Sequence, residues 1–375
     1  MSAAIVLNSD VDAKIAVEHC EVIAYTIPTD APESDGTLAW NSTTVVTVHV
    51  AAAGAEGFGY TYAPPATAQF IRDSLLDVVS AENAFATEAC WQAMVRGVRN
   101  AGHPGIAMCG ISAVDTALWD LKAKLLNLPL CRLWGAVRER VPIYGSGGFT
   151  SYNDQQLQKQ LGGWADQAFA RVKMKVGRNP ADDVRRVMLA RKSIGDEVQL
   201  LVDANGAYER KQALRFAEEF AERADVSWFE EPRPSDDLEG LRLLRDRAPA
   251  GMQIAAGEYG YTLYYFRQML GAGAVDCLQA DVTRCGGFTG LFKVAALCEA
   301  NSLPLSTHCA PYLHLHAACC LGPLVHSEYF YDHARIAKLL FDGYEEPQCG
   351  ALVPNLSRPG HGLSFKKSDA QKYAV

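Results

Sequence analysis

Two lysines stand one residue apart in a short apolar run. The segment Arg171–Val176 reads Arg-Val-Lys-Met-Lys-Val, and this alternation predicts a β-strand on which Lys173 and Lys175 point to the same face. Two like charges held so close disfavour each other, and burial adds to the effect. We therefore expect one amine to release its proton near neutral pH and to act as a general base.

Ionisable side chains also stand at the ends of six later apolar runs. In chain order they are Asp203 with Asn205, Glu230 with Glu231, Glu258, Asp281, His308 and Glu328. The carboxyl ends of parallel strands in a barrel share one face, and active sites form there. Carboxylates gathered on one face repel one another unless a cation neutralises them, and a hard divalent ion prefers oxygen ligands. The sequence therefore predicts a metal-assisted acid–base site.

These side chains need a scaffold that brings them together. From about residue 141, short apolar runs alternate with helical segments, and roughly 20 to 30 residues separate successive runs, as in parallel strands joined by crossover helices. Eight runs in succession favour a (β/α)8-type barrel over an open sheet. The runs are Val141–Tyr144, Val172–Val176, Val198–Val202, Ser227–Phe229, Gln253–Ala256, Cys277–Ala280, Pro304–Ser306 and Val325–Ser327.

The chain before the barrel has a different pattern. Strands are predicted at Cys20–Tyr25 and Thr43–Val50, and the intervening Ile27–Trp40, with two prolines, acidic residues and a glycine, is predicted to be a loop. The aromatic segment Gly57–Tyr62 is predicted to be a turn. A strong helix is predicted over Ala107–Leu126, where apolar residues recur at helical spacing.

Composition narrows the classes of function. The chain has 375 residues, 49% of them hydrophobic, which is enough for two domains with a sizeable core. The net charge of −8 provides no basic surface for nucleic acid or an anionic membrane. Eleven cysteines without a CxxC pair, together with the lack of a leader or a long apolar run, predict a cytoplasmic protein with reduced thiols.

The order and spacing of these motifs resemble the enolase superfamily and, within it, the mandelate racemase subgroup. The resemblance covers most of the chain, and seven motifs in register make it specific. It rests on Lys173 with Lys175, Leu201–Asn205, Trp228–Pro232, Ala256–Glu258, Ala280–Asp281 before Gly286–Gly287, Ser306–His308, and Glu328.

The resemblance implies an α/β fold, a modified TIM barrel of (β/α)7β type with an α+β capping domain. Residues 1–135 are then the capping domain, residues 136–330 the catalytic barrel, and residues 331–375 a C-terminal segment that completes the capping domain. The resemblance also implies a homo-oligomer and a small-molecule substrate, with neither nucleic acid nor membrane as partner.

The resemblance further implies the roles of the site residues. Asp203, Glu230 and Glu258 are expected to bind Mg2+. Lys175 is the expected base on one face of the substrate, with Lys173 beside it, and a His308–Asp281 dyad stands on the other face. Glu328 is expected to donate a hydrogen bond to the substrate carboxylate, which requires a raised pKa. The predicted substrate contacts are Asn205, Trp40, Tyr60 and Arg284.

Bases on two faces of a substrate permit several reactions. The favoured one is the dehydration of an acid sugar to a 2-keto-3-deoxy acid, which makes the protein a hydro-lyase. Racemisation or epimerisation of a 2-hydroxy acid, and cycloisomerisation of a sugar lactone or anhydro acid, remain alternatives. A binding protein that keeps the fold is the non-enzymatic alternative, and the intact acid–base set argues against it.

Overall fold

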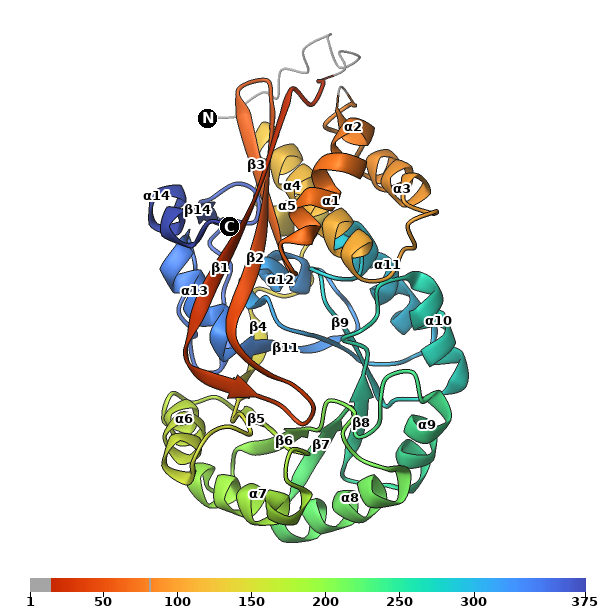
Figure 1. The fold of residues 1–375 in the computed structure, drawn as a ribbon, viewed down its shortest axis with the longest axis vertical. Coiled ribbons are helices and arrows are strands. Elements are labelled where there is room, and N and C mark those ends of the chain that lie inside the picture. Colours follow the sequence, from red (N-terminus) through yellow and green to blue (C-terminus); the bar gives the residue numbers. More distant parts are fainter. Residues whose placement is uncertain (1–14, 81) are drawn as a thin grey trace.

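A computed structural model describes residues 15–80 and 82–375 of the chain (Figure 1). The first fourteen residues of the predicted capping domain lie outside the described residues. The described chain contains a three-stranded antiparallel sheet with helices beside it and a closed barrel of parallel strands. None of the helices in the described residues is both long enough and apolar enough to cross a membrane.

Eight parallel strands form the barrel. Each strand pairs with the next one in the chain, and the last pairs with the first, with Ser327 opposite Ile143. The predicted barrel is therefore confirmed, and each predicted run overlaps one strand. The strands are β4 (Val141–Gly147), β5 (Arg171–Lys175), β6 (Gln199–Asp203), β7 (Val226–Glu230), β8 (Gln253–Ala256), β9 (Cys277–Ala280), β10 (Leu305–Thr307) and β11 (Leu324–Phe330).

Seven helices connect these strands and surround the barrel (Figure 1). Amphipathic patterning places them; α8, for example, buries Phe216 and Phe220 against the strands and exposes its charged face. The last strand is followed by α13 (Tyr331–Leu340). The connecting helices are α6 (Asp154–Asp166), α7 (Pro180–Ile194), α8 (Arg210–Ala224), α9 (Leu238–Arg247), α10 (Leu263–Ala272), α11 (Gly287–Ala300) and α12 (Pro311–Ala318).

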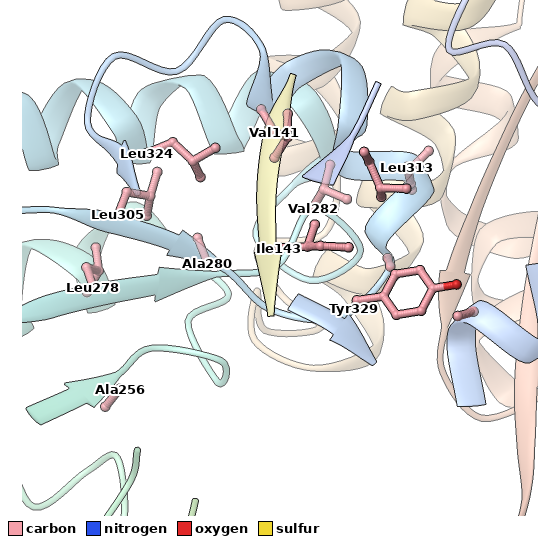
Figure 2. Packing of buried hydrophobic residues seen from close by; sticks show 14 of the residues in the cluster. Val141, Ile143, Ala256, Leu278, Ala280, Val282, Leu305, Leu313, Leu324 and Tyr329 are labelled. Atoms are coloured by element: carbon pink, nitrogen blue, oxygen red, sulfur yellow. The ribbon is translucent and has the colours of Figure 1, made fainter. Parts of the chain in front are cut away.

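Side chains on successive strand positions face opposite ways, so the barrel has two apolar layers. The outer layer packs on the helices, and Figure 2 shows Leu278, Leu305 and Leu324 close together on three neighbouring strands, with Leu313 of α12 on the side of Val282. The inner layer is a separate buried cluster that fills the barrel below the strand ends. Its members are Tyr144, Leu201, Trp228, Ala255 and Cys277.

The N-terminal sheet consists of β1 (His19–Ser34), β2 (Ala39–Ala52) and β3 (Ala55–Tyr62). The prediction of a turn at Gly57–Tyr62 is wrong, because this segment lies inside β3. The glycines serve close packing there: a Cβ on Gly57 would come within 2.2 Å of the Ala117 carbonyl oxygen. Five helices accompany the sheet, α1 (Ala66–Ser74), α2 (Leu76–Val79), α3 (Thr87–Gly97), α4 (Ile106–Leu125), which matches the predicted helix, and α5 (Leu130–Trp134).

A long hairpin of β1 and β2 extends from this sheet over the barrel (Figure 1). Most of Ile27–Trp40 is therefore strand instead of the predicted loop, with a register shift between Pro28 and Glu33. At the hairpin tip, Asp35 accepts hydrogen bonds from the backbone amides of Thr37 and Leu38. The tip lies on the barrel, because a Cβ on Gly36 would come within 2.4 Å of the carbonyl oxygen of Ala204.

The C-terminal segment packs on the N-terminal sheet. The ring centroid of Phe365 lies 5.1 Å from that of Tyr25 and 5.5 Å from that of Phe58, and the centroid of Phe341 lies 4.9 Å from that of Tyr60. We propose domain boundaries near residues 135 and 330, because α5 ends at Trp134 and β11 ends at Phe330. The segment contains β12 (Phe341–Asp342), β13 (Ala351–Leu352), β14 (Ser364–Phe365), α14 (Lys367–Ala370) and a 3-10 turn, η1 (Gln371–Tyr373).

Candidate active site

The strand ends bring the predicted ionisable side chains to one face of the barrel. The pairing of neighbouring strands sets Lys175 of β5 beside Asp203 of β6, and Asp203 beside Glu230 of β7. The remaining groups follow β8, β9 and β10 or lie in β11. All of them are buried: Lys173, Lys175, Asp203, Glu230, Glu258, Asp281, His308 and Glu328.

Three carboxylates form a compact group of oxygen atoms. Asp203, Glu230 and Glu258 each offer an oxygen, and these atoms all lie within 4.8 Å of one another. Oε2 of Glu258 is buried and has no hydrogen-bond partner. An all-oxygen donor set with an unsatisfied carboxylate atom fits a hard divalent cation such as Mg2+.

Both lysines are paired with carboxylates. Nζ of Lys173 lies 2.6 Å from Oε1 of Glu230 and 2.8 Å from Oε1 of Glu328, and Nζ of Lys175 lies 2.5 Å from Oδ2 of Asp203. Burial alone lowers the pKa of each amine, but the neighbouring carboxylates outweigh it and raise the pKa of both above the usual value. This direction is opposite to the expected one. Lys173 does lower the pKa of Lys175, but Asp203 has the larger effect.

His308 and Asp281 form a hydrogen-bonded dyad. Nδ1 of His308 lies 2.8 Å from Oδ2 of Asp281, and Nε2 lies 3.4 Å from Oε2 of Glu258. Burial lowers the pKa of His308, but Glu258 and Asp281 raise it more, so the net pKa lies above the usual value. Burial acts to raise the pKa of Asp281, and His308 and Arg284 hold it well below its usual range. Asp281 therefore orients a ring that favours its protonated form.

Glu328 is held as a carboxylate. Its Oε1 pairs with Lys173, and its Oε2 accepts a 2.7 Å hydrogen bond from the backbone amide of Cys309. Burial acts to raise the pKa of Glu328, but Lys173 and His308 hold it well below its usual range. The prediction of a raised pKa is therefore contradicted, because the cations nearest to Glu328 outweigh the crowding of carboxylates.

Glu230 and Glu231 show the crowding that the sequence indicates. Burial and the Asp203 carboxylate raise the pKa of Glu230 to about 8. Burial and Glu258 raise the pKa of Glu231 well above its usual value. Oε1 of Glu231 is buried without a hydrogen-bond partner, and the residue has a positive φ of 38°. Burial and the neighbouring carboxylates therefore favour the neutral form of Glu230 and Glu231.

The sequence interpretation did not include several neighbours of the site. Sγ of Cys309 lies 3.3 Å from Nε2 of His308. The ring of Tyr144 lies under Lys173, 5.1 Å from Nζ to the centroid, and Nε1 of Trp228 donates to Glu230 over 3.1 Å. Cys309 directly follows a candidate base, and that adjacency was the available signal.

His314 connects two of the loops that carry the dyad. Its Nε2 accepts a 2.9 Å hydrogen bond from the backbone amide of Val282, and its Nδ1 lies 3.1 Å from the carbonyl oxygens of Cys309 and Ala310. His316, two residues later, instead accepts a hydrogen bond from the amide of Cys131. The two histidines of the HxH motif therefore bind different segments of the backbone.

The predicted substrate contacts lie in different surroundings. Arg284 and Asn205 adjoin the site, since Nη1 of Arg284 donates to the Glu258 carbonyl oxygen and the Asn205 amide donates to Asp203. Trp40 donates a 2.8 Å hydrogen bond to Glu33 and lies on the hairpin. Tyr60 is 1% exposed and packs among aromatic rings of the core, and burial and then the Asp281 carboxylate raise its pKa.

Comparisons with known proteins match both parts of the chain. Residues 21–135 match the family model described as the mandelate racemase / muconate lactonizing enzyme N-terminal domain. Residues 156–370 match the model described as enolase C-terminal domain-like. These two matches together cover most of the sequence.

Individual relatives match almost end to end. The 3,6-anhydro-alpha-L-galactonate cycloisomerase of Streptomyces coelicolor is 35% identical over 362 residues, which is 92% of this chain and 96% of the relative. A mandelate racemase/muconate lactonizing enzyme-like protein from Rubrobacter xylanophilus is 53% identical with a TM-score of 0.94, covering 96% of this chain and 100% of that one. L-talarate/galactarate dehydratase from Salmonella typhimurium, liganded with Mg and L-lyxarohydroxamate, has a TM-score of 0.89 at 26% identity, covering 100% and 96%.

Proposed function

Because the chain belongs to the mandelate racemase / muconate lactonizing enzyme family of the enolase superfamily, we propose that it dehydrates an acid sugar to a 2-keto-3-deoxy acid. One observation carries the proposal. The buried acid–base groups of β5 and of the loop after β10 surround a group of three carboxylates that fits a divalent cation. Proton removal next to a carboxylate requires this combination of groups.

We propose Mg2+ as the cofactor, held by Asp203, Glu230 and Glu258. When bound, it supplies positive charge that stabilises the negative charge developing on the substrate carboxylate. The all-oxygen donor set supports this choice, and so does the dehydratase structure that contains Mg. A cation that took Asp203 as ligand would also offset much of the negative charge that now raises the pKa of Lys175.

Different residues of this chain then carry out the two proton transfers of the reaction. Lys175 accepts the proton from C2 of the substrate, with Lys173 and Glu328 as a buried ion pair beside it. His308, oriented by Asp281, donates a proton to the hydroxyl that leaves C3 as water. The C2–H and C3–O bonds break, a C2–C3 double bond forms, and the resulting enol becomes a ketone by taking a proton at C3 and losing the proton of its C2 hydroxyl.

The test is turnover of a panel of mono- and diacid sugars with and without Mg2+, with the 2-keto product detected as its semicarbazone. We expect a product that is one water lighter than its substrate, and loss of activity when a chelator removes the metal. No turnover of any acid sugar, together with no exchange of the α-proton in D2O, would contradict the proposal and favour a binding protein.

A second candidate function is cycloisomerisation, because a relative with that activity is 35% identical over 92% of this chain. It uses the same proton removal, but an internal ring bond breaks and no water leaves. A ring-opened product with unchanged mass identifies this reaction. Recovered substrate with deuterium at the α-carbon and inverted configuration identifies a racemase or epimerase instead.

We also propose a cytoplasmic homo-oligomer. The reduced-thiol composition supports the location. Val137 and Leu356, which line one surface cavity, are 65% and 43% exposed, and apolar side chains of this kind are often covered by another subunit. Sedimentation analysis should show a species heavier than the 40.7 kDa chain, and a species of that mass alone would contradict this part of the proposal.

A further inference from the structure

A second set of metal-binding atoms lies beside the carboxylate group. Nε2 of His308, Sγ of Cys309 and a carboxylate oxygen of Glu328 all lie within 4.8 Å of one another. Sγ is 3.3 Å from Nε2, and Oε2 of Glu328 is 3.9 Å from the same nitrogen. This set contains nitrogen, sulfur and oxygen, and it shares no residue with Asp203, Glu230 and Glu258.

We propose that His308, Cys309 and Glu328 form a site for a thiophilic divalent cation, of which Zn2+ fits best, and that filling this site inhibits the enzyme. Thiolate and imidazole ligands select Zn2+, whereas Mg2+ prefers oxygen ligands and keeps several waters. The inhibition rests on the proposed function, but the binding does not.

The distances suit a tetrahedral ion. Bonds of about 2.3 Å to sulfur and about 2.1 Å to nitrogen and oxygen place nitrogen about 3.6 Å from sulfur and about 3.4 Å from oxygen. The distances in the structure, 3.3 Å and 3.9 Å, differ from these by about half an ångström or less. Small side-chain rotations therefore complete the three protein ligands, and a water molecule can take the fourth position.

The surroundings hold these ligands in place. Asp281 binds Nδ1 of His308, which is the carboxylate–histidine–metal arrangement that fixes the ring and directs Nε2 to an ion. Cys309 and Ala310 have positive φ values of 50° and 39°, and His314 binds the carbonyl oxygens of both. The loop conformation that sets the thiol beside the imidazole is therefore stabilised from outside the site.

Inhibition is expected because the ion would bind Nε2 of His308. In the proposed reaction, Nε2 of His308 donates a proton to the leaving hydroxyl. An ion bound to Nε2 occupies its lone pair, so the ring cannot carry that proton. Because the two sets of ligands are separate, excess Mg2+ should not relieve the inhibition.

The test uses Co2+ as a coloured substitute for Zn2+ on the full chain with excess Mg2+. A thiolate ligand produces strong near-ultraviolet absorption with Co2+, whereas oxygen and nitrogen ligands do not. We expect wild-type protein to develop this absorption with one equivalent of Co2+ and to lose it when Zn2+ is added. Cys309→Ser should lack it, and Cys349→Ser, which removes an exposed thiol, should retain it. A wild-type protein without the absorption, or undiminished absorption in Cys309→Ser, would overturn the site.

A second variant leaves the thiol in place. Asp281→Asn should weaken Co2+ binding about 10- to 100-fold, as the loss of a carboxylate that orients a ligating histidine does; unchanged affinity would contradict the arrangement. In a turnover assay, Cys309→Ser should need at least tenfold more Zn2+ for half-inhibition of its own activity. Absorption without turnover would reject the proposed function alone, and turnover without absorption would reject the zinc site alone.

Discussion

Lys175 and His308 lie on opposite arcs of the barrel, since β5 and β10 are three strands apart in one direction and five in the other. In the proposed reaction, this arrangement sets one of the two groups on each side of the substrate. If the proposed roles hold, we expect that neither group replaces the other when it is lost.

We expect Lys175→Ala and His308→Ala each to lower kcat by about 10²- to 10⁴-fold, the usual contribution of a general acid or base. The measurement is turnover of the acid sugar found in the panel, with circular dichroism to verify folding. Lys211→Ala is the matched control, because Lys211 is exposed on α8, and it should keep wild-type activity. Near-native kcat in either active-site variant would show that this base is misassigned.

Asp115 of α4 lies outside the candidate active site, and its ionisation should make the stability of the folded protein depend on pH. It is fully buried and accepts hydrogen bonds from the amide and hydroxyl of Thr289 in α11. Burial raises its pKa from 3.8 to about 7, against the lowering effect of Thr289, with a smaller contribution from Glu88. Because the folded pKa is raised, the stability from Asp115 is fully present below about pH 4 and is lost as pH rises through about 7, by about 4 kcal/mol at most.

Asp115→Asn removes this titration. The free energy of unfolding of the variant, minus that of the wild type, should therefore become more positive between about pH 4 and about pH 8. Denaturant unfolding at several pH values measures it. A constant difference for Asp115→Asn would contradict the prediction.

Strands were the elements that the sequence predicted best. The apolar runs of the barrel are short and bounded, and five of the eight are followed directly by a polar residue, so both the strand and the position of Asp203 or Glu230 followed from local pattern. The glycines misled the prediction in β3. Glycine is common in turns, but Gly57 lies in a strand, where the lack of a side chain lets α4 pack closely. A packing partner so distant in sequence leaves no local signal.

Ionisation could not be predicted from spacing along the chain. The two neighbouring amines suggested a lowered pKa for one lysine, yet Lys173 is paired with Glu230 and Glu328, which lie 57 and 155 positions later in the sequence. The sign of such a pKa change depends on which charges the fold brings nearest. The same reason explains the missed contact between Cys309 and His308, whose side chains meet only because of the loop conformation.

The hairpin of β1 and β2 depends on Gly36. In Gly36→Ala the new methyl group would collide with the backbone oxygens of Ala204 and Val176, 2.4 Å and 2.7 Å away, so the tip must move off the barrel. We expect the KM for the substrate to rise with a smaller change in kcat, because the tip lies on the backbone that directly follows Lys175 and Asp203.

Steady-state kinetics and limited proteolysis of the hairpin measure this effect. Gly271→Ala is the control: a Cβ there meets no atom within 4 Å, and the residue lies in α10, where alanine should be neutral or stabilising by up to about 1 kcal/mol. An unchanged KM and unchanged proteolysis in Gly36→Ala would show that the tip tolerates displacement.

At the scale of the whole molecule, the two ends of the chain share one apolar interface. Phe341 and Phe365 come from the C-terminal segment, and Tyr25 and Phe58 come from the N-terminal sheet. Lys367 adds an ion pair with Glu21 on the surface. The barrel thus lies in sequence between two segments that pack together, and we expect the stability of the sheet that carries the hairpin to depend on the C-terminal segment.

Phe341→Ala tests this dependence. Phe341 is fully buried, and its truncation leaves a cavity, so the free energy of unfolding should fall by about 3–5 kcal/mol. Denaturant titration measures it. Tyr264→Ala, at a side chain that is 65% exposed, should change stability by about 0.5 kcal/mol or less. A loss below about 1 kcal/mol for Phe341→Ala would mean that the C-terminal segment contributes little.

The ring of His314 links the two loops that carry Asp281 and His308. One of its nitrogens binds the backbone that follows Asp281, and the other binds the backbone that follows His308. We therefore expect a displacement of one loop to be transmitted to the other through the His314 ring. As a result, we expect His308 and Asp281 to keep their relative positions when these loops fluctuate.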